Sequence, residues 1–243
     1  MPAILEATDL RKAFRISATP HEVLRGVSLT VEQGQFVALV APSGEGKSTL
    51  LHVLSGLDAP DSGRIVIEGQ DVTAMNEEQR TVFRRKNIGF VFQFFNLVPT
   101  LTAAENVALP FRIGGEGSDF GRVSELMDRL SLHGLQGHRP DEISGGEQQR
   151  IAIARALVTR PALVMADEPT GNLDFVTGNE VLDVLRSFNE EGQTVIMATH
   201  SARAAAAADR VLVLRDGQIV DDIARDKATS VSRLVQKLQA HGL

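Results

Sequence analysis

The key to the fold lies in residues 36–49, which read Phe36-Val-Ala-Leu-Val-Ala-Pro-Ser-Gly-Glu-Gly-Lys-Ser-Thr49. The first five residues are continuously apolar, as in a strand that is covered on both faces of a parallel sheet. A glycine-bearing loop follows, and the pattern after Lys47 turns helical. Such a strand, loop and helix start place backbone N–H groups and the positive end of a helix dipole around a polyphosphate. The sequence therefore predicts an α/β fold with a phosphate loop.

Each residue of this loop is a candidate nucleotide-binding residue. We expect Lys47 to neutralise the β and γ phosphates of ATP and the Ser48 hydroxyl to bind Mg²⁺. Ala41 stands where such loops usually carry glycine, but the proline after it favours an extended backbone that alanine can adopt. Taken alone, the motif could also be a plain turn between a strand and a helix. The candidate set is Ala41, Pro42, Ser43, Gly44, Glu45, Gly46, Lys47, Ser48 and Thr49.

A second apolar strand, predicted at residues 162–166, ends in the carboxylates Asp167 and Glu168. In α/β folds, ligands bind beyond the carboxyl ends of the strands. Asp167 is placed to hold Mg²⁺ through its water shell, and Glu168 to orient and polarise the attacking water as a general base. Taken alone, a strand ending in Asp-Glu is also a common turn.

Composition excludes several other classes of function. The chain has 243 residues and no cysteine, so disulfides, thiol catalysis and cysteine-based zinc sites are ruled out. A net charge of −6 without a long Lys/Arg cluster argues against a nucleic-acid partner, because such binding depends on phosphate neutralisation. No apolar run approaches the roughly 20 residues of a spanning helix. Any membrane role is therefore expected to come through a partner.

The rest of the chain follows an α/β pattern. Apolar strands expected near 162–166, 194–198 and 211–214 alternate with helical segments, which is typical of a parallel sheet covered by helices. Residues 77–139 are mostly helical in period, with a loop expected at 114–117. An apolar stripe at 231–238 is expected to dock on the core of the protein itself.

A rarer motif, Ile143-Ser-Gly-Gly-Glu147, precedes a helical segment. It presents the Ser144 hydroxyl, the Gly145 and Gly146 amides and a helix N-terminus, which together form a second anion site. The motif resembles the signature of the ABC ATPase family, whose usual form is Leu-Ser-Gly-Gly-Gln, with Ile143 and Glu147 differing here. The resemblance implies that Ser144, Gly145, Gly146 and Glu147 act in trans, on the γ phosphate held by a second copy of the chain in a head-to-tail dimer.

Other elements of the family follow in order, and the resemblance covers nearly the whole chain. It implies that Gln93 contacts Mg²⁺ and the attacking water, that Asp174 belongs to a D-loop at the dimer seam, and that His200 is a switch histidine on the γ phosphate. Phe14 takes the place of the aromatic residue that stacks on adenine, where tyrosine is more usual. The other histidines show no spacing typical of metal ligands and are expected in loops or on helix surfaces.

The resemblance also implies the architecture: a P-loop NTPase of ABC type, with a mostly parallel RecA-like sheet, an N-terminal antiparallel β subdomain and a helical signature lobe. We expect one domain over residues 1–243. Residues 1–90 and 160–243 would form the catalytic core with its antiparallel part, and residues 91–159 the helical lobe.

Within the family, three segments are similar to the lipoprotein-release, macrolide-export and cell-division (LolD/MacB/FtsE) branch: 93–102, 105–110 and 167–174. Members of this branch pair with integral membrane permeases, so the resemblance implies an ATP- and Mg²⁺-dependent ATPase in the cytoplasm, bound through a permease to the inner face of the cell membrane. The segment 94–109 is where a permease would dock, and ordinary packing within the helical lobe is the alternative for some of its residues.

Three other functions remain open from the sequence. An importer ATPase for amino acids or similar solutes would share the same motifs. A soluble ABC protein of translation or DNA repair would carry two fused cassettes or long coiled coils, which this sequence lacks. A regulatory ATP-binding module with little turnover is disfavoured by Glu168 and His200.

Overall fold

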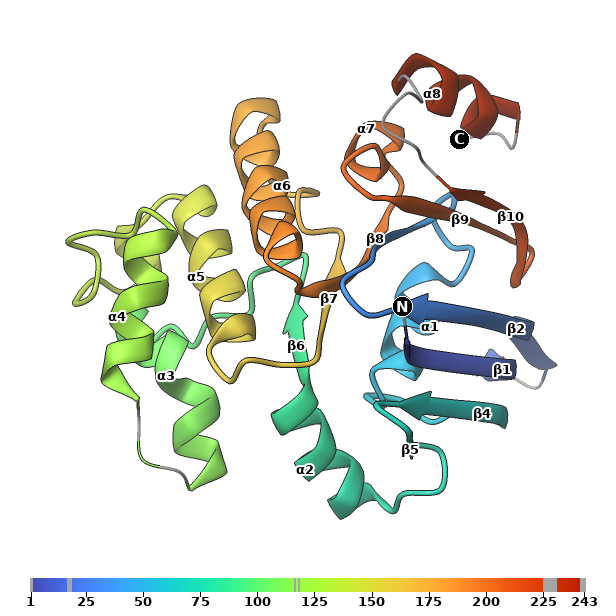
Figure 1. The fold of residues 1–243 in the computed structure, drawn as a ribbon, viewed down its shortest axis with the longest axis horizontal. Coiled ribbons are helices and arrows are strands. Elements are labelled where there is room, and N and C mark those ends of the chain that lie inside the picture. Colours follow the sequence, from blue (N-terminus) through green and yellow to red (C-terminus); the bar gives the residue numbers. More distant parts are fainter. Residues whose placement is uncertain (1, 17–18, 116, 118, 225–230, 241–243) are drawn as a thin grey trace.

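The computed structural model describes residues 2–16, 19–115, 117, 119–224 and 231–240. His241 and residue 116 of the expected loop at 114–117 lie outside this range. The described strands form two sheets (Figure 1). The larger is a six-stranded sheet in the order β10-β9-β3-β8-β7-β6, in which all neighbours are parallel except the pair β10 and β9. Its strands are β3 (Phe36–Val40), β6 (Ile88–Val91), β7 (Leu163–Asp167), β8 (Thr194–Thr199), β9 (Arg210–Arg215) and β10 (Gln218–Ala224).

The smaller sheet is antiparallel and has the order β2-β1-β4-β5. Its strands are β1 (Ala3–Ile16), β2 (Thr19–Glu32), β4 (Ser62–Ile67) and β5 (Gln70–Asp71). In β2, Val27, Leu29 and Val31 are buried and the residues between them are exposed, as the alternating pattern predicts. Several register shifts interrupt the pairing of β1 with β2, so these two long strands carry local irregularities of the kind that bulges produce.

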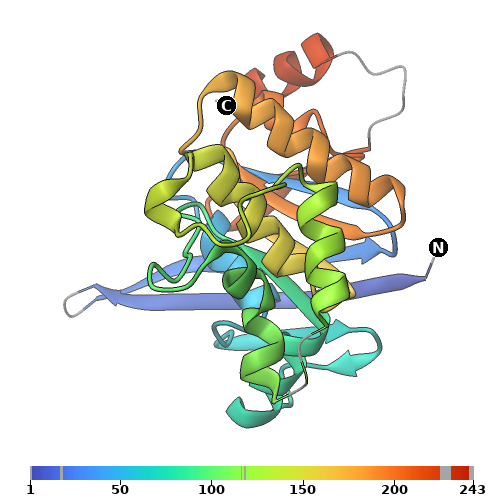
Figure 2. The same ribbon diagram turned by 90° about the vertical axis from the view of Figure 1, so that its left-hand side faces the viewer.

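Helices cover the larger sheet and fill one end of the molecule (Figure 1). Figure 2 shows that α3, α4 and α5 lie side by side at that end. The bounds are α1 (Lys47–Leu54), α2 (Glu77–Asn87), α3 (Ala103–Gly114), α4 (Phe120–Arg129), α5 (Gly145–Leu157), α6 (Phe175–Glu190), α7 (Ala202–Ala205) and α8 (Val231–Ala240), with a 3-10 turn η1 (Pro140–Glu142) before α5.

The central strands divide the core into two layers because alternate side chains point to opposite faces of the sheet. Phe36, Ala38 and Val40 join the cluster beneath α3 to α8, whereas Val37 and Leu39 face the cluster formed with α1, α2 and the smaller sheet. All five residues of β3 are fully buried, as the continuous apolar run predicts. On α8, Leu234 and Leu238 are fully buried in the first cluster, so the tail docks on the core of the protein as expected.

One segment differs from its expected secondary structure. Residues 88–91 lie in a region of helical period, but they form β6, which pairs in parallel with β7 at the edge of the larger sheet. The gain in backbone hydrogen bonds at the sheet edge outweighs a weak local helical pattern. Among the described residues, no helix is long and apolar enough to cross a membrane.

Candidate functional site

The phosphate loop connects the buried strand β3 to α1 and turns on two glycines. Gly44 and Gly46 have φ values of 89° and 90°, in the left-handed region that favours glycine. A Cβ on Gly46 would also collide with the Val23 side chain. Glu45 ties the loop to the β9–β10 turn, because its carboxylate accepts a hydrogen bond of 2.7 Å from the Asp216 backbone N–H. Ser43 and Gly44 are exposed at the tip, and Thr49 is half-buried in the first turn of α1.

Lys47 is folded back onto the loop that carries it. Its Nζ donates to the carbonyl oxygens of Ala41 at 2.7 Å and Pro42 at 3.1 Å. The side chain is only 7% exposed, and burial lowers the pKa of this ammonium, although the charges of Glu168, Asp167 and Glu45 oppose that shift. A cation held in this way needs little further desolvation to meet a phosphate.

Ser48 and Asp167 meet across the larger sheet although they lie far apart in the sequence. The Ser48 hydroxyl donates to Asp167 Oδ1 at 3.0 Å. Burial raises the pKa of Asp167, and the Ser48 hydrogen bond partly offsets that shift. One hydroxyl and one carboxylate at the carboxyl end of β7 are hard oxygen donors of the kind that Mg²⁺ takes together with waters and phosphate oxygens. Among the described residues, no group of three or more His, Asp or Glu side chains could hold a metal ion without such help.

Glu168 is a buried carboxylate between the loop and His200. Its Oε1 lies 2.9 Å from His200 Nδ1 and 3.8 Å from Lys47 Nζ. Its backbone φ of 45° is unusual for a residue other than glycine. Two hydrogen bonds hold the backbone here: the Glu168 N–H donates to the Ala198 carbonyl, and the Gly171 N–H donates to the Glu168 carbonyl. These bonds aim the side chain back toward the phosphate loop. The structure thus brings together Lys47, Ser48, Asp167, Glu168 and His200.

Gln93 and Asp174 flank this group through the turn that follows β7. A Cβ placed on Gly171 would lie 3.1 Å from Gln93 Nε2, so the amide packs directly against the D-loop. Asn172 Nδ2 also donates to the Gln93 carbonyl at 2.8 Å. Asp174 caps α6 by accepting from the N–H groups of Val176 and Thr177, and the hydrogen bonds from Thr177 hold its pKa below the usual value.

The signature lies at the N-terminus of α5 and forms a capping box. Ser144 caps the helix, its hydroxyl and backbone N–H each donate to Glu147 Oε2 at 2.7 Å, and these bonds lower the pKa of Glu147. Gly146 packs so tightly on Thr177 that a Cβ would clash. In the part of the chain that the structure describes, no hydrogen bond or ion pair joins Ser144, Gly145, Gly146 or Glu147 to the phosphate loop.

Phe14 lies on β1, opposite His21 of β2, near the outer end of the β1–β2 hairpin. Its ring is 41% exposed, and Lys12 Nζ lies 5.3 Å from the ring centroid. A half-exposed ring beside a lysine offers a face for stacking. His21 itself is exposed on a strand, so the expectation that it lies in a loop or on a helix was wrong.

Two residues that connect these pieces were missed by the sequence analysis. Arg155 on α5 is largely buried, and its guanidinium donates to the carbonyls of Phe95 and Asn96, two residues with positive φ just after Gln93. Burial lowers the pKa of Arg155. Gln149 is fully buried and donates to Pro169 O at 2.8 Å, just after Glu168. Both residues occur in the helix that follows the signature, but nothing in a helical pattern reveals such contacts.

Known proteins share this combination of sequence and fold. The sequence matches the family described as "ABC transporter" over residues 24–171, which include the phosphate loop, the signature and the Asp167–Glu168 pair. The chain belongs to the ABC transporter family. It is an ATP-binding, ATP-hydrolysing subunit of that family, with the P-loop fold that the sequence predicts.

This ABC subunit is 47% identical over 221 residues to the lipoprotein-releasing system ATP-binding protein LolD of Psychrobacter arcticus, covering 89% of this chain and 98% of the relative. It is 42% identical over 219 residues to the macrolide export ATP-binding/permease protein MacB of Bdellovibrio bacteriovorus, covering 90% of this chain and 34% of the relative. The chain thus spans about a third of that relative's length.

A solved structure of the ATP-binding cassette MJ0796, dimeric and bound to ADP and Pi in a post-hydrolysis state, is similar to the ABC subunit with a TM-score of 0.84 and 36% identity. The similarity covers 91% of this chain and 99% of that one. The predicted membership of the LolD/MacB branch is confirmed by the relatives.

Proposed function

We propose that this chain hydrolyses MgATP at composite sites formed between two copies arranged head to tail. Lys47 and the loop amides would bind the β and γ phosphates, Phe14 would stack on adenine, and Glu168 would act as the general base on water oriented by His200 and Gln93. The observation that carries this proposal is the buried Glu168 carboxylate, which lies within 2.9 Å of His200 and 3.8 Å of Lys47.

Mg²⁺ would be held by the Ser48 hydroxyl and the Gln93 side chain, with Asp167 acting through its water shell. The 3.0 Å contact between Ser48 and Asp167 supports this assignment, because it gathers two hard oxygen donors at the edge where phosphates would lie. When bound, the ion supplies charge neutralisation and orients the phosphates. The side chains themselves bind and orient the nucleotide and accept the proton from water.

The signature supports a second copy of the chain as the first partner. Ser144, Gly145 and Gly146 present an anion site at a helix N-terminus, but among the described residues they form no hydrogen bond or ion pair with the phosphate loop of their own chain. A second phosphate-binding motif therefore needs a second nucleotide, and a head-to-tail pair supplies it. The dimeric state of the similar cassette favours the same arrangement.

An integral membrane permease is the second proposed partner. A groove of about 360 Å³ lies between β6, α3 and α5, beside the loop that follows Gln93. It is mainly apolar, and Ile113 at its rim is 66% exposed. We expect a cytoplasmic helix of the permease to dock here, holding the chain at the inner face of the cell membrane. The lining includes Phe90, Phe92, Leu109, Pro110, Ile113 and Ala156.

The relatives' names favour a permease of the lipoprotein-release or macrolide-export type over an importer. Affinity purification of the tagged chain from native membranes, followed by identification of the bound permease, tests this proposal. Ile113→Glu should abolish recovery of the permease, whereas Phe120→Glu, a control at a 73% exposed residue of α4 outside the groove, should not. Equal recovery with both variants would place the docking surface elsewhere.

A further inference from the structure

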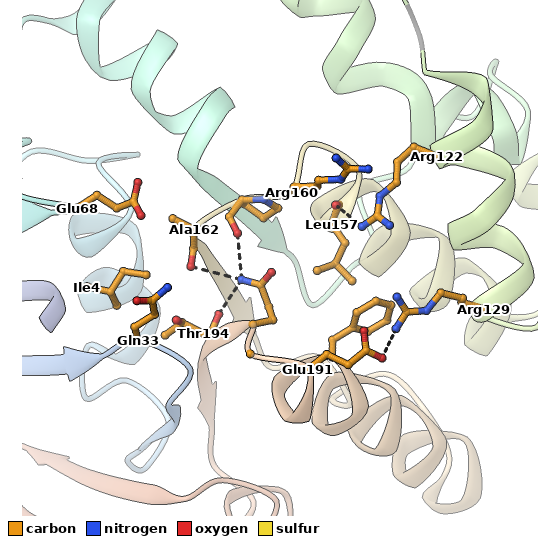
Figure 3. A pocket seen from close by; sticks show the side chains of 14 residues that line it. Ile4, Gln33, Glu68, Arg122, Arg129, Leu157, Arg160, Ala162, Glu191 and Thr194 are labelled. Atoms are coloured by element: carbon orange, nitrogen blue, oxygen red, sulfur yellow. Dashed lines mark hydrogen bonds and ion pairs between the residues drawn. The ribbon is translucent and has the colours of Figure 1, made fainter. Parts of the chain in front are cut away.

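A pocket of about 360 Å³ lies beside the amino ends of β7 and β8 (Figure 3). Ala162 on its wall directly precedes β7 and Thr194 begins β8, whereas Asp167 stands at the opposite end of β7. The pocket is bounded by α4, by the connection from α5 to β7, by the end of α6 and by residues of the smaller sheet. It is therefore separate from the nucleotide site and from the groove proposed for the permease.

Three arginines line one side of this pocket, around the Leu157 side chain (Figure 3). Arg122 and Arg129 lie about two helical turns apart on α4, so they share one face of that helix. Arg160 comes from the connection between α5 and β7. The acidic residue Glu68 lies on the other side of the pocket, beside Ile4 and Gln33. The three cations of the pocket thus lie on one side, where Glu191 offsets the charge of one of them, Arg129.

Arg122 has a hydrogen-bond donor without an acceptor. Its terminal nitrogens reach Glu125 at 2.9 Å and Leu157 O at 3.5 Å, and the side chain is only 13% exposed. Its Nε is buried and has no partner among the residues that the structure describes. A buried donor left unpaired costs free energy, so a movement of this guanidinium that brings its Nε to the acceptor of a ligand would be favourable.

Arg160 and Arg129 also have guanidinium N–H groups that could donate hydrogen bonds to a ligand. The guanidinium of Arg160 has no partner within the described ranges, and its backbone φ of 52° is uncommon outside glycine. Arg129 uses one terminal nitrogen to pair with Glu191 at 2.5 Å and stacks on the Phe188 ring at 4.2 Å. The stacking and the ion pair fix the plane of the Arg129 guanidinium, and with it the directions of the N–H groups that are not paired with Glu191.

We propose that this pocket binds a small anion bearing one or two phosphate groups. Guanidinium groups pair with phosphate oxygens through two parallel hydrogen bonds, and donors arriving from two separate elements suit a tetrahedral group. Glu68 across the pocket repels a longer polyanion, which limits the ligand to the arginine side. The proposed site lies apart from the phosphate loop, between α4 and the larger sheet.

Calorimetric titration with inorganic pyrophosphate tests the site, in EDTA and with saturating ADP to fill the phosphate loop. The wild type should bind pyrophosphate, and Arg160→Gln should weaken binding by at least about tenfold because a charge-assisted contact is lost. Arg160→Lys should have an affinity for pyrophosphate between those of the wild type and Arg160→Gln, because lysine keeps the positive charge but cannot form two parallel hydrogen bonds. The control Lys237→Gln, at an exposed cation on α8, should bind like the wild type.

Because the exposed side chain of Arg160 forms no hydrogen bond or ion pair among the described residues, the variants should unfold at the wild-type temperature without pyrophosphate. Only the variants that bind pyrophosphate should be stabilised by it. No binding by the wild type, or equal binding by Arg160→Gln, would overturn the proposal. Citrate that bound as tightly as pyrophosphate would refute the selectivity for phosphate.

Discussion

His200 Nδ1 lies 2.9 Å from Glu168 Oε1, so the histidine that follows β8 and the carboxylate that follows β7 are in direct contact. The two strands are neighbours in the sheet, and their carboxyl ends therefore bring the two side chains together. A γ phosphate bound beside Lys47 would therefore lie next to both groups at once.

Replacing Glu168 by glutamine should remove the base while leaving nucleotide binding intact. In the proposed head-to-tail dimer, hydrolysis would separate the two copies, so Glu168→Gln should accumulate a stable dimer with ATP and Mg²⁺ that the wild type forms only transiently. Size-exclusion chromatography with and without ATP measures this. A variant that stays monomeric with ATP and still turns over would exclude Glu168 as the base.

Adding Ser144→Arg to Glu168→Gln should abolish that dimer without abolishing ATP binding by the monomer. The bulky cation would block the γ phosphate only where the second copy closes. Binding of a fluorescent ATP analogue, measured beside chromatography, separates the two effects. Loss of monomer binding in Ser144→Arg alone would mean that the signature acts within its own chain.

Lys47→Ala should weaken ATP binding and abolish turnover, because the phosphates lose the cation that the Ala41 and Pro42 carbonyls hold in place. Equilibrium binding and phosphate release measure the two effects. Lys237→Ala, at an exposed position of α8, is the matched control and should behave as the wild type. Wild-type turnover in Lys47→Ala would refute the phosphate-loop assignment.

Ala41→Gly should change the ATP affinity by less than about tenfold, since residue 41 contributes its carbonyl and its backbone is restricted by Pro42. The fully buried methyl group of Ala41 packs in the core, so the variant should lose some stability instead. Calorimetry and thermal unfolding distinguish the two effects. A hundredfold change in affinity would show that alanine itself tunes the loop.

Glu147→Gln, made in the Glu168→Gln background, should strengthen the ATP-dependent dimer several-fold. The Glu147 carboxylate accepts the hydrogen bond of the Ser144 hydroxyl, so that hydroxyl is not available to donate to a phosphate. The carboxylate also adds negative charge where the γ phosphate held by the second copy would lie. A glutamine amide is neutral and can instead donate a hydrogen bond to the hydroxyl oxygen. Analytical ultracentrifugation gives the dimer dissociation constants.

The pKa of Glu147 lies below its usual value because Ser144 donates to it. A carboxylate with a lowered pKa stays ionised down to that pKa, so the effect of Glu147→Gln should be the same at about pH 6 and about pH 8. If Glu147→Gln strengthened the dimer at about pH 8 but not at about pH 6, the Glu147 carboxylate would have to become protonated in the dimer.

Gly89→Ala should destabilise the protein by about 1–3 kcal/mol, because a Cβ there would collide with the Ala156 carbonyl where β6 crosses α5. Gly137→Ala is the control, since a Cβ at that site meets no atom within 4 Å among the described residues. Denaturant unfolding compares the two. Equal stability would mean that β6 can move away from α5 at no cost.

The sequence by itself determined the local units of this protein. The apolar run at 36–40, the glycines of the loop and Lys47 at the helix start are read from neighbouring residues, because strand burial and loop geometry depend on local pattern. The same is true of the capping box at Ser144 and Glu147.

Only the tertiary structure decided which of these units meet. The hydrogen bond of Ser48 to Asp167 and that of His200 to Glu168 follow from the strand order β3-β8-β7, which no local pattern contains. Strand β6 exists because β7 offers it a free edge, and the arginine pocket draws its residues from separate elements. Contacts between distant segments depend on the free energy of packing the whole chain, so their residues cannot be paired from spacing alone.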